Sequence, residues 1–302
     1  MLRGKILRKI YFTTLIIFVL FIASSFTINK DISNIKLEYQ TKLSSIYLLD
    51  DNNYLLKVNI GVKDNLMDNI PIVINSLKEG SNHYSGLRGI IPHDTKINSI
   101  NLKNGILNID FSKEFLNINE DLCEKEIESI VYSLLDFNEV NGVRISVNKK
   151  PLKELLKSNT LIDDVLNKDF GINKEYTITS MNDIQKVVLY FYEEKENNKY
   201  YVPVTKYLNS KDDKIKIIID NLRSNYLVKT NLMSYLNEKI AIESYEELND
   251  TVTISFASVF DFNDKEPLEE VIYTLSNSII DSNVATKVIF MQNERILFIK
   301  QK

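Results

Sequence analysis

The chain has 302 residues, of which 44% are hydrophobic and 26% are charged. This length and composition fit an anchor with two modest globular domains and exclude general disorder. A single cysteine excludes an intrachain disulfide and a cysteine-cluster metal site. Residues 1–30 carry five basic residues and no acid, which leaves 32 basic against 41 acidic residues in the remainder, a net charge of −9. Such an acidic body lacks the basic surface that nucleic-acid binding requires, so we expect no nucleic-acid partner.

An uncharged, apolar stretch runs from residue 10 to residue 28, which is about the length needed to cross a bilayer. Four basic residues precede it, and this asymmetry favours a cytoplasmic N-terminus and an extracytoplasmic body. We therefore predict a single-pass anchor in the cell membrane within residues 1–30 and a juxtamembrane stalk over residues 31–45. The alternative is a cleavable signal peptide with Ala23-Ser24-Ser25 as its small-residue site, which would make the body a secreted protein.

The first elements after the stalk are two predicted strands and a helix. Apolar and β-branched residues over 46–49 and 54–62 flank a polar turn, which is the pattern of a hairpin. Apolar residues from Met67 to Leu77 then recur at helical spacing. The expected helix signals are Asp68 as the N-cap, Pro71 in the first turn and Gly80 as the stop.

The next elements predict a second hairpin, a longer helix and a closing strand. Asn104-Gly105 is a strong turn signal, because both residue types tolerate positive φ. Residues 107–111 alternate between apolar and polar, which indicates a half-buried strand. Apolar spacing over 127–135 predicts a helix, with Cys123 near its start as a small core residue. Alternation over residues 143–147 predicts the last strand of this unit.

The chain then repeats this pattern. Residues 46–62, 72–80, 104–115 and 124–134 match residues 188–205, 216–225, 249–260 and 265–275. Four matches in the same order and at similar separations indicate a duplication. Each copy has the order ββαββαβ over about one hundred residues, which is an ordinary size for an α+β domain.

We therefore predict an α+β fold with two tandem ββαββαβ domains. The first domain spans residues 46–150, and the second spans residues 185–302 and ends in a hairpin around Asn293-Glu294. Residues 151–184 contain closely spaced apolar residues and lack the Gly, Ser and Pro bias of a flexible linker. We expect this segment to be a short helical connector.

The chain offers little material for catalysis or for metal binding. His83 and His93 lie in one predicted loop together with Ser81, Ser85 and Asp94. Catalytic triads are defined by geometry rather than by closeness in sequence, and a closed metal site needs about four ligands. We interpret both histidines as solvated loop residues, and we expect no enzymatic activity, no metal and no cofactor.

Two clusters of acidic residues could suggest the paired carboxylates of a glycosidase. One consists of Glu124, Glu126 and Glu128, and the other of Glu243, Glu246 and Glu247. Both stand beside apolar helix or strand positions, so we interpret both clusters as solvated faces.

Two segments are candidates for an interaction surface. The first is the predicted loop made of Gly89, Ile90, Ile91, Pro92, His93 and Asp94, which we interpret as a docking segment. The alternative is that its apolar residues begin a buried strand. The second is the tyrosine-rich opening hairpin of the second copy, represented by Tyr192 and Tyr201. Ordinary strand packing would also place tyrosines there.

A series of short motifs runs through the first copy. It consists of Leu77-Lys78-Glu79-Gly80, Gly86-Leu87 with Ile91-Pro92, Asn104-Gly105, Asp110-Phe111-Ser112 and Val131-Tyr132-Ser133-Leu134. On these residues the first copy resembles the GerM-domain family of sporulation and spore-germination proteins. The second copy keeps Pro203-Val204-Thr205 and the pattern of residues 271–275 but lacks the glycine and proline positions, so it resembles a degenerate copy.

The resemblance implies a non-enzymatic protein of endospore formation and germination that acts at the outer face of a membrane. It implies domains similar to ring-building motifs, protein partners in a spore-envelope or mother-cell/forespore assembly, and the option of a homo-oligomer. We therefore expect a membrane-anchored scaffold. The alternative is a cell-wall module that binds peptidoglycan and recruits or regulates a wall hydrolase. A hydrolase in its own right is a third class, which would require His83 or His93 for function.

Overall fold

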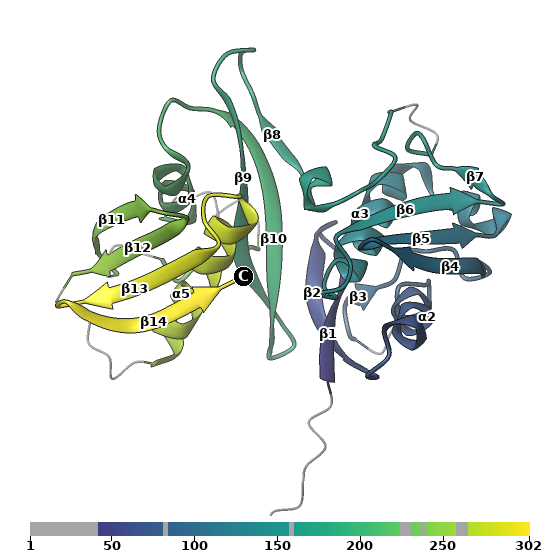
Figure 1. The fold of residues 1–302 in the computed structure, drawn as a ribbon, viewed down its shortest axis with the longest axis horizontal. Coiled ribbons are helices and arrows are strands. Elements are labelled where there is room, and N and C mark those ends of the chain that lie inside the picture. The colour runs from purple at the N-terminus through teal and green to yellow at the C-terminus, as the bar shows by residue number, and fades with distance from the viewer. Residues whose placement is uncertain (1–41, 81–83, 157–159, 224–230, 237–239, 258–264) are drawn as a thin grey trace, which may run out of the picture. The chain divides into compact units, whose positions relative to one another are not determined.

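The first copy follows the predicted order of strands and helices. In the computed structural model its elements are β1 (Lys42–Asp50), β2 (Leu55–Val62), α2 (Leu66–Ser76), β3 (Leu87–Arg88), β4 (Ile97–Lys103), β5 (Ile106–Phe111), α3 (Cys123–Leu134), β6 (Gly142–Val147) and β7 (Lys150–Pro151). Two short 3-10 turns, Lys113–Asn117 and Glu120–Leu122, precede α3. The predicted strands and helices of this copy are confirmed, and β3 and β7 are additional short strands (Figure 1).

The structure describes residues 42–80, 84–156, 160–223, 231–236, 240–257 and 265–302. The predicted anchor over 1–30 and the stalk as far as residue 41 lie outside the described residues, as do Ser81 and His83. Within the described ranges, every helix is too short or too polar to cross a bilayer. Residues 43–302 form one compact unit that contains both copies.

Helix α2 begins before its predicted cap. The N-cap is Asn65, whose side-chain oxygen accepts a hydrogen bond from the backbone N–H of Met67. Asn and Asp cap helices about equally well, so the sequence alone did not separate Asn65 from Asp68. Pro71 therefore lies in the second turn, where it removes one helical hydrogen bond. The helix ends at Ser76 with Leu77 as its C-cap, and Gly80 lies beyond it with a φ of 72°.

The second copy repeats the same element order. Its elements are β9 (Ile184–Lys195), β10 (Asn198–Asn209), α4 (Lys214–Arg223), β11 (Ile242–Leu248), β12 (Thr251–Phe256), α5 (Lys265–Asp281), β13 (Lys287–Gln292) and β14 (Arg295–Gln301). The final hairpin turns at Asn293-Glu294, where both residues have positive φ. The predicted hairpin at the end of the chain is therefore confirmed.

The predicted helical connector is wrong. The described part of residues 151–184 contains no α-helix, and its regular elements are the 3-10 turn Lys168–Phe170 and strand β8 (Glu175–Thr177). Single bridges join Val143 to Leu166 and Glu154 to Leu161. The apolar residues of the connector follow the surface of the first copy instead of one face of a helix, with Leu155 and Leu166 buried and Leu161 exposed.

Each copy has a four-stranded sheet of the same design. The strand orders are β4-β5-β6-β7 and β11-β12-β13-β14. In both sheets the first pair is antiparallel, the second is parallel and the third is antiparallel. The turns Asn104-Gly105 and Asn249-Asp250 join the first two strands, and all four turn residues have positive φ. This repeated topology supports the duplication inferred from sequence.

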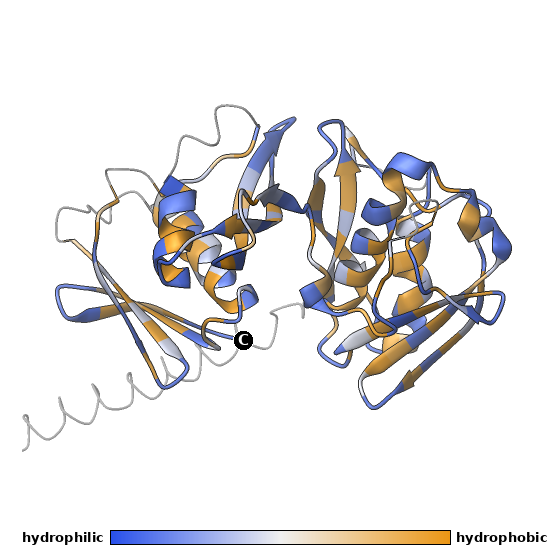
Figure 2. Cartoon of the chain, turned by 90° about the horizontal axis from the view of Figure 1, so that it is seen from above, coloured by the Kyte–Doolittle hydropathy of each residue, from blue (hydrophilic) through white to orange (hydrophobic). Residues whose placement is uncertain are grey.

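The opening hairpins of the two copies join in a third sheet. Its order is β3-β1-β2-β10-β8, and β9 also pairs with β10. Strands β2 and β10 are antiparallel and meet at Lys57 and Tyr201, so that they lie side by side between the copies (Figure 1). The helices show hydrophobic and hydrophilic sides in Figure 2, as expected for helices that cover a sheet with one face. Buried residues from both copies form one continuous hydrophobic core.

Candidate functional site

The predicted docking segment is mostly buried. Ile90 and Ile91 are 1% and 0% exposed, and Gly89 and Pro92 are also buried. The backbone N–H groups of Ile90 and Ile91 both donate to the carbonyl of Leu77, and the N–H of Glu79 donates to the carbonyl of Ile91. A side chain at Gly89 would collide with the carbonyl of Lys78, 2.3 Å from the added carbon. The apolar part of the segment therefore packs beside the end of α2 and is not available for docking.

Only the last two residues of that segment are accessible. The side chains of His93 and Asp94 are 78% and 85% exposed, and His93 Nδ1 lies 3.3 Å from Asp94 Oδ1. Ser85 donates instead to Glu196, at 2.6 Å. The structure therefore gives Ser85 and His93 different partners, and His83 lies outside the described residues.

Tyr192 and Tyr201 lie within the molecule. Tyr192 is 6% exposed and stacks on Tyr235, with ring centroids 4.7 Å apart. Tyr201 is half-buried, stacks on Tyr273 at 3.8 Å and donates its hydroxyl proton to Glu270 at 2.6 Å. Their contacts are those of strand packing, which was the alternative interpretation of this hairpin.

The prediction of two solvated acidic faces is correct for one cluster and wrong for the other. Glu243, Glu246 and Glu247 are exposed on β11. On α3, however, Glu126 and Glu128 are 0% and 1% exposed. Asn173 and Lys174 of the connector contact Glu128, and Glu79 lies near Glu126, a tertiary effect that helical spacing does not reveal. Burial raises the pKa of both carboxyl groups, most strongly that of Glu126.

Asn173, in the connector, joins the two copies at the shared sheet. Its side-chain oxygen accepts from the N–H of Leu55 at 2.8 Å, and its amide donates to the carbonyls of Leu55 and Pro203 at 2.9 and 2.8 Å. These contacts connect β2 to β10 near the point where the two strands meet. The backbone N–H of Asn173 donates to Glu128 at 2.9 Å, so one of the buried carboxylates holds the connector in place.

The two copies carry a similar strand-to-helix contact, although the serines lie about one helical turn apart in the register of the repeat. In the first copy, Ser133 of α3 accepts from the N–H of Tyr47 at 3.0 Å, and Ser129 donates to its carbonyl at 2.7 Å. In the second copy, Ser278 of α5 accepts from the N–H of Tyr190 at 2.9 Å. These serines satisfy strand-edge backbone groups that would otherwise be buried without partners.

Tyr47 and Tyr190 also occupy matching positions. Each forms an edge-to-face pair with a helix tyrosine, Tyr47 with Tyr132 at 5.7 Å and Tyr190 with Tyr273 at 6.2 Å. Burial is the main cause that raises the pKa of both strand hydroxyls, and the nearby carboxylates Asp136 and Asp281 add to it. The hydroxyl groups therefore remain protonated hydrogen-bond donors at neutral pH.

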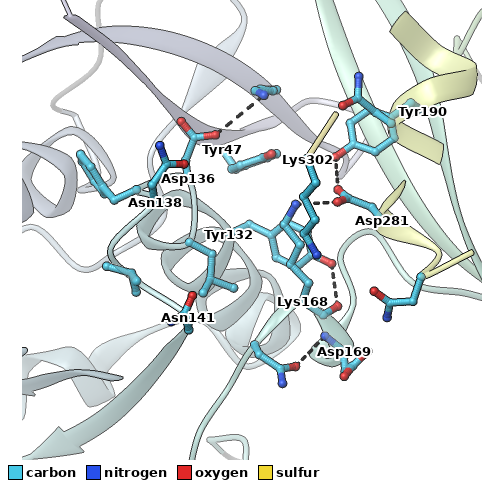
Figure 3. Close-up of a pocket in the computed structure, with 17 residues that line it drawn as sticks. Tyr47, Tyr132, Asp136, Asn138, Asn141, Lys168, Asp169, Tyr190, Asp281 and Lys302 are labelled. Atoms are coloured by element: carbon cyan, nitrogen blue, oxygen red, sulfur yellow. Dashed lines mark hydrogen bonds and ion pairs between the residues drawn. The ribbon is translucent and has the colours of Figure 1, made fainter. Parts of the chain in front are cut away.

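A cleft of about 560 Å³ opens beside these tyrosines (Figure 3). Both copies and the connector contribute to its lining, which includes the amides Asn138, Asn141, Asn167, Asn277 and Asn283. On one wall, Lys57 lies 3.8 Å from Asp136, which also accepts from the N–H of Ser45 at 2.7 Å. On the other wall, Asp281 accepts from Tyr190 at 2.6 Å and from Lys168 at 2.7 Å. The cleft is thus rich in amides and in paired charges, a lining suited to a polyhydroxylated or amide-bearing ligand.

A second cluster of charges joins the copies away from this cleft. Lys195 of β9 lies 3.6 Å from Asp50 and 4.0 Å from Glu193. Both carboxylates are almost fully buried, and burial together with the charge of Asp50 raises the pKa of Glu193 to about 7. Within the described residues, no group of three or more His, Cys, Asp or Glu side chains could hold a metal ion.

The residues that join the copies were missed at the sequence level. Asn173 lies in a segment that apolar spacing assigned to a helix, and no local pattern marks an asparagine that bonds to distant strands. A signal did exist for the tyrosines. Tyr47 and Tyr190 fall near the start of the first pair of matching segments, and Tyr132 and Tyr273 are identical within the last pair.

Comparison with known proteins shows what the chain is similar to. Residues 45–153 match the family model Germane, described as sporulation and spore germination. The spore germination protein GerM of Bacillus subtilis (strain 168) is 27% identical over 262 residues, which are 82% of this chain and 72% of that protein. The solved structure of the tandem GerMN domains of the sporulation protein GerM from Bacillus subtilis matches with a TM-score of 0.71 at 24% identity, over 85% of this chain and 92% of that chain.

The three matches agree with the motifs of the first copy and with its tandem repetition. The family model covers the first copy, and the solved structure has the same tandem fold. The resemblance inferred from residues 77–134 is confirmed: residues 45–153 match the family model of sporulation and spore germination, and the chain is similar to GerM over most of its length.

Proposed function

We propose that this chain is a non-enzymatic scaffold of endospore formation and germination, acting at the extracytoplasmic face of a membrane. The observation that carries this proposal is the shared sheet, in which β2 of the first copy pairs with β10 of the second. Asn173 and the tyrosine and serine contacts described above reinforce the same boundary. The two copies therefore present their outer surfaces at a fixed spacing, which is what a scaffold for several protein partners requires.

Two further points support the proposal. The named relative in Bacillus subtilis is a spore germination protein, and the apolar stretch over residues 10–28 would hold the body at a membrane. The accessible histidine, His93, pairs with Asp94, while the nearby Ser85 donates to Glu196, so the described residues of this loop do not pair a serine nucleophile with a histidine base. Similarity to ring-building motifs makes packing of several domains side by side the expected mode of assembly.

The test uses a spore-forming strain whose own copy of the gene is deleted. The strain is complemented with the wild-type chain, with the variant Asn173→Ala, or with Asn148→Ala as a control, each as a fluorescent fusion. We expect the wild type and the control to accumulate at the engulfing membranes and to restore spores. Asn173→Ala should fail to restore spores at equal protein level. Uniform membrane signal with normal spores in the deletion strain would overturn the proposal.

The cleft favours a second candidate function, binding of peptidoglycan glycan. Exposed amides such as Asn138 and Asn141 line it, and amide and carboxylate groups are suited to hydrogen bonds with sugar hydroxyl and acetamido groups. The full chain would be sedimented with purified peptidoglycan, and the double variant Asn138→Ala/Asn141→Ala should reduce the bound fraction several-fold. Asn101→Ala, on the exposed strand β4, is the matched control. Equal binding by all three proteins would exclude the cleft as a glycan site.

A further inference from the structure

The two four-stranded sheets differ at one edge. In the first copy, the outer side of β6 is occupied by Lys150 and Pro151 of β7 and by Leu166 of the connector. In the second copy, the full strand β14 takes the place of β7, and β11 and β14 are the outermost strands of its sheet (Figure 1). Among the described residues, no strand pairs with the outer side of either one. An unpaired strand edge is a template for pairing with another chain.

Strand β14 is unusually apolar for a sheet edge. Ile296, Phe298 and Ile299 are 53%, 44% and 46% exposed, and they make up three of its seven residues. Exposed edge strands are normally short or interrupted by charge, because a long apolar edge promotes association. Burial of these side chains would favour association by about 25 cal/mol for each Å² of apolar surface removed from water.

The two outer strands carry opposite charges. Strand β14 and the residue after it contain the basic residues Arg295, Lys300 and Lys302 and no acid. Strand β11 contains the exposed acidic residues Glu243, Glu246 and Glu247 and no base. None of these six side chains forms an ion pair with another residue in the part of the chain that the structure describes. Each edge thus offers unpaired charges of the sign that the other edge lacks.

The strand directions are compatible with pairing of the two edges between copies. Strand β11 is antiparallel to β12, β12 is parallel to β13, and β13 is antiparallel to β14, so β11 and β14 run in the same direction. A second molecule that continues the sheet would place its β11 parallel to β14 of the first. Arg295 would then lie near Glu243 at the start of the strands, and Lys300 near Glu247 at their end.

We propose that copies of this chain associate head to tail, with the apolar, basic edge β14 of one molecule pairing with the acidic edge β11 of the next. Symmetric pairing of β14 with itself would oppose like charges, which is unfavourable for directly facing residues in a sheet. A head-to-tail contact uses two different surfaces, so it builds a ring or an open filament and does not stop at a dimer. The inference deepens the scaffold role proposed above by naming the surfaces through which the scaffold would grow.

The first test reverses each charged edge separately. One variant of the full chain carries Glu243→Lys, Glu246→Lys and Glu247→Lys, and the other carries Arg295→Glu, Lys300→Glu and Lys302→Glu. In sedimentation velocity in mild detergent, the wild type should form a concentration-dependent series larger than a dimer. Each variant alone should lose all species larger than the monomer, because its two edges now have the same sign. An equimolar mixture of the two variants should regain the series, because each reversed edge complements the other variant.

The control carries Lys63→Glu, Lys96→Glu and Lys103→Glu, three exposed lysines of the first copy. This control should associate as the wild type does. A wild type that remains monomeric, or a mixture that remains monomeric while both variants are folded by circular dichroism, would overturn the proposal. The wild type gives a further test without any substitution, since added salt should weaken the association. The association is measured with purified protein, whereas the scaffold role is tested by spore formation. A negative association result would therefore overturn only the head-to-tail proposal and not the scaffold role.

Disulfide crosslinking tests the strand direction. Cys123 is buried, so cysteines introduced on the edges supply the accessible thiols. A mixture of Glu243→Cys and Arg295→Cys chains should crosslink, because parallel pairing brings the two strand starts together. The matched mixture of Glu243→Cys and Gln301→Cys should not. The reverse result would mean that the two edges meet antiparallel and would contradict the parallel pairing derived from the strand directions.

Discussion

The first and second copies share a design and differ in what they leave exposed. Both contain the same sheet directions, a similar serine contact from a helix to a strand edge, and the same pair of tyrosines at their common boundary. In the first copy the connector covers the sheet edge and the side of α3, whereas in the second copy β14 remains open. The comparison indicates that the boundary between the copies constrains both sequences alike, while the outer edges are where the two copies have diverged.

Removing the asparagine at the boundary should have the largest effect on stability. Asn173→Ala leaves the N–H and carbonyl of Leu55 and the carbonyl of Pro203 without their present partners. Since each buried polar group left unpaired costs about 1–3 kcal/mol, we expect a loss of about 3 kcal/mol or more in the free energy of unfolding, measured by urea denaturation.

Asn148→Ala is the matched control for this prediction. Asn148 and Asn173 both have a φ of 48°, but Asn148 is exposed in a turn and its side chain makes no hydrogen bond with a described residue. The control should therefore lose only about 1 kcal/mol in the free energy of unfolding, because alanine is less favourable than asparagine at a positive φ. Equal losses for both variants would mean that the bonds of Asn173 to β2 and β10 do not stabilise the boundary.

The buried glutamate of the first copy should make its stability depend on pH. Among the described residues, neither carboxylate oxygen of Glu126 has a hydrogen-bond partner, and burial raises its pKa well above 4.5. The folded chain therefore keeps this proton at pH values at which the unfolded chain releases it. The contribution of this carboxyl group to the free energy of unfolding is fully present below about pH 4.5. It falls as the pH rises towards the raised pKa of the folded state, by up to about 1.4 kcal/mol per pH unit. Relative to the wild type, Glu126→Gln should show a flatter profile in urea denaturation between pH 5 and pH 8.

The second copy provides the control for this pH effect. Glu269, near the start of α5, is exposed. Glu269→Gln should leave the pH profile of stability as it is in the wild type. A wild-type profile that Glu126→Gln does not change would show that the buried carboxyl group is not the source of any slope.

Removing the serine contact should lower the free energy of unfolding by about the same amount in both copies. Ser133→Ala and Ser278→Ala each leave one strand N–H group without its side-chain partner, that of Tyr47 or Tyr190. We expect a loss of about 1–2 kcal/mol for each in urea denaturation. Ser276→Ala is the control: Ser276 is also buried, but among the described residues its hydroxyl group bonds to the carbonyl of Tyr273 in its own helix, so its removal leaves no strand N–H without a partner and should lower the free energy of unfolding by less than either main variant does. A large difference between the two main variants would show that the matching contacts are not equivalent.

The smallest effect is expected in the exposed part of the loop. His93→Ala removes a side chain that is 78% exposed and contacts only the exposed Asp94 among the residues described. The free energy of unfolding should change by less than about 0.5 kcal/mol, and spore formation should be normal. Loss of spores with an unchanged melting curve would instead support a functional role for this loop, including the hydrolase that was the third class considered from sequence.

The sequence predicted the strands, helices and turns of both copies well, because local rules determine them. Asn104-Gly105 requires positive φ in a hairpin, and the spacing of apolar residues over 127–135 identifies the buried side of α3. What failed depends on contacts between distant segments. The burial of Glu126 and Glu128 comes from segments outside their own helix, and the burial of Ile90 and Ile91 comes from backbone bonds to Leu77. Neither periodicity nor composition contains that information.

The pairing of β2 with β10 also has a consequence for the order in which the chain folds. Lys57 and Tyr201 are far apart in sequence, so during synthesis β2 is complete long before β10 exists. Protein synthesis proceeds at about 5–20 residues per second, so β2 is exposed without β10 for a time on the order of ten seconds. Asn173 emerges before β10, and its bonds to the N–H and carbonyl of Leu55 could form first. We expect the connector to shield the first copy from premature pairing until the second hairpin arrives.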